Sequence, residues 1–118
     1  MFWITFAIIW QANNCKMGQF GASIKNLREK KGLLQRQIAA HLNIDTPMLS
    51  KIERGERYAK KEQISQLAEL LGVSEDSLHS LWLADKVYEV VKDEKTALKA
   101  IEFAEEQIKY VKKKKYKD

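Results

Sequence analysis

The chain has 118 residues, of which 45% are hydrophobic, with five glycines and one proline. This size and apolar content suffice for one modest hydrophobic core and exclude an intrinsically disordered chain. The net charge is +5, and the only cysteine, Cys15, excludes a disulfide framework or a thiolate zinc site within one chain and agrees with a reducing, cytoplasmic location.

Positive charge is segregated along the chain. Residues 17–58 contain eight Lys or Arg and four Asp or Glu, residues 59–110 are net acidic, and residues 111–118 contain five Lys and one Asp. Such segregation favours a polyanionic partner. Solvated helix faces followed by a solubilising tail would give the same balance.

The first ten residues are apolar in a way that no later segment is. The run is about half the length of a membrane-spanning helix, and it lacks the basic start and the cleavage site of a secretory signal, so we expect no membrane insertion. Residues 1–16 are therefore interpreted as an apolar extension. It either lies upstream of a natural start at Met17 or forms a hydrophobic arm that packs on the domain or on a partner.

Few helix breakers and abundant Leu, Ala, Glu and Lys predict an all-α fold. One helix begins at Phe20 and ends before Gly32, and a second starts at Leu34 and ends at Asn43, a residue type that tolerates a left-handed turn. A third opens at residues 45–47, where Asp or Thr caps the helix and Pro occupies its first turn, and it closes at Gly55.

Two further helices are predicted over residues 61–71 and 74–83, which makes a five-helix domain of residues 17–83. Residues 84–118 then form a C-terminal helical element with a basic tail. Its last helix runs from about residue 95 to 113 and carries a narrow apolar seam, of the kind that packs helix against helix. The seam consists of Ala97, Ile101, Ala104, Ile108 and Val111.

Residues 34–57 contain two helices of about eight residues joined by a short turn, with the small Ala39 where they cross. In such an arrangement the second helix can enter a DNA major groove. Residues 20–82 resemble the Cro and phage-repressor type of helix-turn-helix, the xenobiotic response element family. The resemblance rests on Gln35, Ala39, residues 42–44, residues 49–55 and residues 70–73. Asn43 stands where the family usually has Gly, and Pro47 where relatives carry a polar residue that contacts bases.

The resemblance implies binding of double-stranded DNA by the outward face of the second motif helix, and a structural ion pair between Arg28 and Glu53. Lys51 is expected to donate to guanine, while the start of the first motif helix and the residues after the second contact phosphates. The predicted DNA-binding residues are Gln35, Arg36, Thr46, Pro47, Met48, Ser50, Lys51, Arg54 and Arg57. Tyr58 and Trp82 are assigned to core packing.

Nothing in the sequence points to catalysis. His41 and His79 lie on different predicted helices without ligand spacing to other metal-binding residues, and there is no Gly-rich phosphate loop or nucleophile elbow. We therefore predict no enzyme activity, no metal and no cofactor.

The favoured hypothesis is a homodimeric transcriptional regulator of the repressor or restriction-modification controller type. Residues 84–118 either form the dimer contact or fold back to complete the monomer's core. Two alternatives remain: an antitoxin whose C-terminal helices bind a toxin protein, and a protein-interaction module without DNA recognition.

Overall fold

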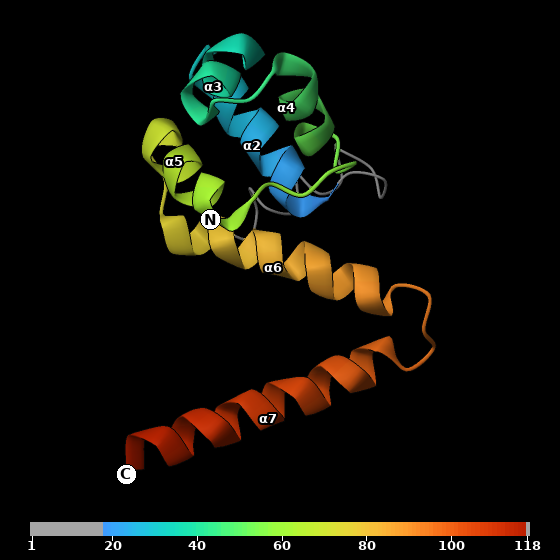
Figure 1. The fold of residues 1–118 in the computed structure, drawn as a ribbon. Coiled ribbons are helices and arrows are strands. Elements are labelled where there is room, and N and C mark those ends of the chain that lie inside the picture. Colours follow the sequence, from blue (N-terminus) through green and yellow to red (C-terminus); the bar gives the residue numbers. More distant parts are fainter. Residues whose placement is uncertain (1–17, 118) are drawn as a thin grey trace. The chain divides into compact units, whose positions relative to one another are not determined.

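The computed structural model describes residues 18–117, so the predicted extension over residues 1–16, with Cys15, lies outside the described residues. The described part contains six helices and no strand (Figure 1), which confirms the all-α prediction. The helices are α2 (Gln19–Lys30), α3 (Gln35–Leu42), α4 (Thr46–Glu53), α5 (Lys61–Leu71), α6 (Glu75–Val91) and α7 (Ala97–Lys117). The chain divides into two compact units, Met1–Lys86 and Val87–Asp118, and α6 contributes to both.

Local signals in the sequence set the ends of α3 and α4. Asn43 adopts the predicted left-handed conformation, with φ 59°, and the Ile44 N–H returns to the Ala39 carbonyl at 2.9 Å. The Asp45 carboxylate caps α4 by accepting a hydrogen bond of 2.8 Å from the Met48 N–H, and Pro47 lies in the first turn. The turn between the two helices is therefore short and fully specified by residues 43–47.

The core of the first unit is built from α2 to α6 together with the loop before α5. Its buried hydrophobic side chains are Phe20, Ile24, Ile38, Ala39, Leu42, Leu49, Ile52, Ala59, Ile64, Leu67, Ala68, Leu71, Leu78 and Trp82. Each large member contributes about 1.5–3 kcal/mol by leaving water. In Figure 1, α4 lies against both α2 and α3.

The helices α2 and α4 are in close backbone contact at Gly21. A Cβ atom at this position would lie 2.3 Å from the Ile52 carbonyl oxygen and 2.7 Å from that of Glu53. Backbone atoms cannot yield to that contact as a flexible side chain can, so only glycine fits there.

Two expectations from the sequence are wrong. Leu34, expected as the first residue of the second helix, precedes α3 in an extended conformation, with φ −88° and ψ 153°, and is 49% exposed. Tyr58 is also 49% exposed, in the loop between α4 and α5. The core assignment of Trp82 is confirmed, since it is 8% exposed and its indole N–H donates to the Ala59 carbonyl at 2.8 Å.

The start of α2 is held by a side chain 65 residues away. Asp85 of α6 accepts hydrogen bonds from the backbone N–H groups of Gln19 (2.8 Å) and Phe20 (3.0 Å). A Cβ atom at Gly18 would lie 2.6 Å from the same carboxylate. Asp85 thus replaces a local N-cap residue and fastens α6 to α2.

The second unit consists of the end of α6, the connection and α7. Within Ala97–Lys115 no side chain is buried, and the seam residues Ile101, Ile108 and Val111 are 38%, 57% and 56% exposed. Among the described residues, no helix is both long enough and apolar enough to cross a membrane.

Replacing Asp85 by alanine tests its role as a remote cap. We expect Asp85→Ala to lower the free energy of unfolding by about 1–2 kcal/mol, because two N–H groups lose their acceptor. The measurement is urea denaturation followed by circular dichroism. An unchanged midpoint would contradict this role.

Burial raises the pKa of Asp85, against the opposing effect of the two backbone hydrogen bonds. The native state therefore holds this proton more tightly than the unfolded chain, and the stability that the group contributes is lost as the pH rises through the raised pKa. Relative to Asp85→Asn, the wild type should lose stability as the pH rises from the ordinary aspartate range through the raised pKa of Asp85. A difference in stability between the wild type and Asp85→Asn that does not change with pH would contradict this prediction.

Candidate nucleic-acid interface

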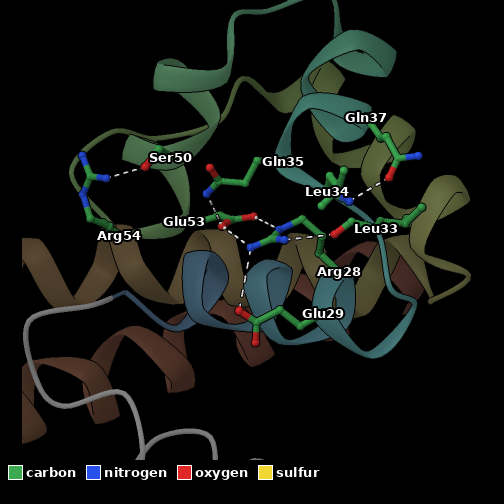
Figure 2. A network of polar contacts seen from close by, with 9 residues as sticks. All are labelled: Arg28, Glu29, Leu33, Leu34, Gln35, Gln37, Ser50, Glu53 and Arg54. Carbon is green, nitrogen blue, oxygen red and sulfur yellow. Dashed lines mark hydrogen bonds and ion pairs between the residues drawn. The ribbon is translucent and has the colours of Figure 1, made fainter.

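A buried carboxylate organises the three helices that build the candidate site. Arg28 of α2 donates to Glu53 at the end of α4 through Nε (2.8 Å to Oε2) and Nη2 (3.2 Å to Oε1), and its Nη1 donates to the Leu33 carbonyl at 3.0 Å. Glu53 is 1% exposed. The ion pair that the resemblance implied is therefore present, and Figure 2 shows both side chains pointing toward each other.

Gln35 completes this network from α3. Its Nε2 donates to Glu53 Oε1 at 2.9 Å, so the carboxylate receives hydrogen bonds from residues of two other helices. The hydrogen bond to Glu53 is the main cause that raises the pKa of Arg28. Every buried side-chain nitrogen and oxygen atom in the described part of the chain has a hydrogen-bond partner. The network thus fixes α4 against α2 and α3.

The outward face of α4 carries most of the predicted contact residues. Thr46, Pro47 and Lys51 are exposed, and Ser50 is half-buried. Met48 is half-buried and packs against the core, so it projects outward less than the sequence analysis expected. The reason is its position one helical turn before Ile52, which places it on the flank of the buried stripe.

Arg54 and Ser50 are brought together at the end of α4. The Arg54 guanidinium donates to Ser50 Oγ through Nη1 and to Glu56 Oε2 through Nη2, the latter at 2.8 Å. The pKa of Glu56 is lowered, chiefly by this hydrogen bond from Arg54, with the charge of Lys51 acting in the same direction. Lys51, Arg54 and Glu56 therefore share one charged patch.

Glu56 is the residue of this patch that the sequence analysis missed. It follows Gly55, whose left-handed backbone (φ 76°) ends α4, and its N–H returns to the Lys51 carbonyl at 2.9 Å. The glycine was recognised as a helix end. A left-handed glycine at the end of a helix reverses the chain and brings the next side chain back beside the last helical turn. Gly55 was therefore the signal in the sequence that could have identified Glu56.

The remaining predicted residues lie around this patch. Arg36 is exposed in the first turn of α3, and Arg57 is exposed in the loop that follows α4. Gln35 differs from the prediction in that its amide N–H group is directed at Glu53. Within residues 18–117, no group of three or more His, Cys, Asp or Glu side chains is placed to hold a metal ion.

Comparison with known families matches residues 24–78 to the helix-turn-helix family model. The chain belongs to the helix-turn-helix family. Within it, α3 and α4 are the two motif helices, and the protein is a DNA-binding transcriptional regulator. No curated protein matches the chain.

Solved structures similar to this helix-turn-helix protein include two bacterial regulators. The restriction-modification controller protein C.AhdI from Aeromonas hydrophila is 32% identical, with a TM-score of 0.46, over 50% of this chain and 89% of that one. The clp gene regulator ClgR from Corynebacterium glutamicum is 25% identical in one structure (TM-score 0.47, 55% of this chain and 84% of that one) and 20% in another (TM-score 0.49, 72% and 88%).

Removal of Arg28 tests the buried network. Arg28→Ala should destabilise the fold by about 3–5 kcal/mol, because Glu53 would remain buried without its charge partner. Arg36→Ala, an equal truncation at an exposed position of α3, is the control and should change stability by less than about 0.5 kcal/mol. Thermal and urea unfolding check both variants. Equal, small effects would show that Glu53 does not depend on Arg28.

Proposed function

We propose that this protein binds a specific duplex site as a homodimer and represses transcription by occupying it. The observation that carries the proposal is the exposed outer face of α4, with Lys51 at its centre, on a helix whose orientation is fixed by the Glu53 network. Such a face on a rigid support can enter the major groove without first being ordered.

The direct contacts with bases come from α4. Lys51 donates to guanine O6 or N7, Thr46 and Ser50 exchange hydrogen bonds with bases or phosphates, and Pro47 or the exposed part of Met48 contacts a thymine methyl group. Lys51 is the main determinant, because it is a charged donor on the exposed side of the helix.

The phosphate contacts surround this helix. Arg36 and the N-terminal amides of α3 face the backbone on one side, with Gln35 positioned between them and Glu53. Arg54 and Arg57 contact phosphates on the other side. Glu56 already pairs with Arg54, so a phosphate competes with this carboxylate for the guanidinium.

Dimerisation follows from the small size of one module, which makes too few contacts for specific binding at physiological salt. The α7 seam supports a contact with a second copy, because its five residues recur at four- and three-residue spacing and three of them, Ile101, Ile108 and Val111, are exposed. Two linked modules can then occupy half-sites about one helical turn apart. Repression by occupancy needs no catalytic activity and implies a cytoplasmic location, where bacterial DNA is found.

Lys51→Ala tests base recognition. Once the preferred site has been selected from random duplex DNA, we expect the variant to bind it about 10- to 100-fold more weakly and to lose preference at one base position. Fluorescence anisotropy with single-base variants of the site measures both. Lys99→Ala, the same charge change on α7, is the control. Unchanged preference at every position would remove Lys51 from base recognition.

The dependence on salt separates the proposal from a protein-interaction module. Several phosphate contacts make log K fall steeply with log salt, with a slope of about −0.9 for each phosphate. A protein without salt-dependent affinity for any duplex would not be a DNA-binding regulator.

Ile108→Glu tests the dimer. This residue is 57% exposed, so the substitution should leave the monomer fold intact, while a carboxylate in the seam disfavours pairing with a second copy. We expect monomer mass in sedimentation and roughly tenfold weaker binding to the full site. Lys99→Glu, on the opposite side of α7, should remain dimeric. An unchanged dimer mass would show that the seam does not form the dimer contact, and would favour binding of another protein there, as in the antitoxin alternative.

A further inference from the structure

One turn of α6, residues 82–86, holds the loop that follows α4. The Trp82 indole N–H donates to the Ala59 carbonyl at 2.8 Å, and both residues are buried. The Lys86 ammonium lies 3.6 Å from the centre of the Trp82 ring and 5.4 Å from that of Tyr58. His79 also stacks on Trp82, with 5.6 Å between the two ring centroids.

The same turn also supports the end of α4 from the side of α2. Asp85 binds the first N–H groups of α2, and Gly21, in the first turn of that helix, lies directly against the Ile52 and Glu53 carbonyls. Contacts from α6 therefore reach the end of α4 by two routes, one through α2 and one through the loop.

Arg57 lies between two fixed points of this loop. On one side the Glu56 N–H is bonded to the Lys51 carbonyl, and on the other side Ala59 is 2% exposed and bonded to Trp82. Only Arg57 and Tyr58 separate these anchors, and Tyr58 is contacted by Lys86. The loop lacks regular helix between Glu56 and Lys60, so these contacts, and not a hydrogen-bond ladder, set its path.

We propose that Trp82 and Lys86 are positioning residues for DNA binding, which hold the loop so that the Arg57 guanidinium meets a phosphate beside α4. The inference rests on the proposed function. The anchored loop places the Arg57 backbone before DNA arrives, so less conformational freedom is lost when the phosphate contact forms. Trp82 and Lys86 themselves touch no DNA in this arrangement.

Coupling between Trp82 and Arg57 distinguishes positioning from general stabilisation. Trp82→Phe keeps an aromatic ring in the core and removes the N–H that binds Ala59. We expect Arg57→Ala to reduce the slope of log K against log salt by about one and the affinity by roughly tenfold, equally for the selected site and for random duplex. Trp82→Phe should produce the same kind of loss, and the double variant should be little weaker than Arg57→Ala alone.

Leu78→Val is the matched control, because Leu78 is a buried residue of α6 that does not contact the loop through a hydrogen bond. Its effect on binding should be small and should add to that of Arg57→Ala. All affinities are measured well below the unfolding temperature of each variant, so that loss of folded protein does not enter. Additive effects of Trp82→Phe and Arg57→Ala, or an unchanged salt slope in Trp82→Phe, would overturn the positioning role.

Lys86→Met keeps the proposal testable if Trp82→Phe does not fold. This substitution removes the charge of a half-buried residue that lies over the Trp82 and Tyr58 rings. It should weaken DNA binding less than Trp82→Phe does, and in the Arg57→Ala background it should cause no further loss of affinity. A lysine that contacted phosphate directly would instead give an additive loss. Wild-type protein without salt-dependent binding would refute the proposed function, whereas normal wild-type binding with additive variants refutes only the positioning by α6.

Discussion

The structure depends on a buried carboxylate at the end of α4. Transfer of an isolated carboxylate out of water costs several kcal/mol, so Glu53 is tolerated only because Arg28 and Gln35 supply charge and hydrogen bonds from α2 and α3. Each donor comes from a different helix, and the network is satisfied only when all three helices are in place. Apolar contacts alone would let the helices pack in several ways. Because these buried polar groups need specific partners, the helices are restricted to one defined geometry.

The surface proposed to face DNA takes its shape from that geometry. The side of α4 that bears Leu49 and Ile52 is buried, so the opposite side, with Thr46 and Lys51, is held outward. The charge on this surface is mixed, because Glu56 accompanies Arg54 and lies near Lys51. The surface therefore combines cations that attract a duplex with an anion that limits how strongly they do so.

Features encoded by neighbouring residues could be predicted from the sequence. Asn43, Asp45 and Pro47 gave the turn before α4, and helical spacing gave most of the core. The Arg28–Glu53 pair was accessible only through the family resemblance, since the residues are 25 positions apart. The contacts of Asp85 with α2, of Trp82 with Ala59 and of Gln35 with Glu53 depend on the packed arrangement of helices, which no local pattern contains. Tyr58 was misassigned because aromatic character alone does not determine burial in a loop.

Positions in this domain differ in the substitutions that they accept, and the close approach of α2 and α4 at Gly21 shows the difference. A single added methyl group there would collide with the backbone at the end of α4. Thr46 and Lys51, in contrast, lie on the exposed side of α4 and outside the hydrophobic core. Under the proposed function, changes on the outer face of α4 can therefore alter the preferred operator, whereas the contact between α2 and α4 beneath that face admits only glycine at position 21.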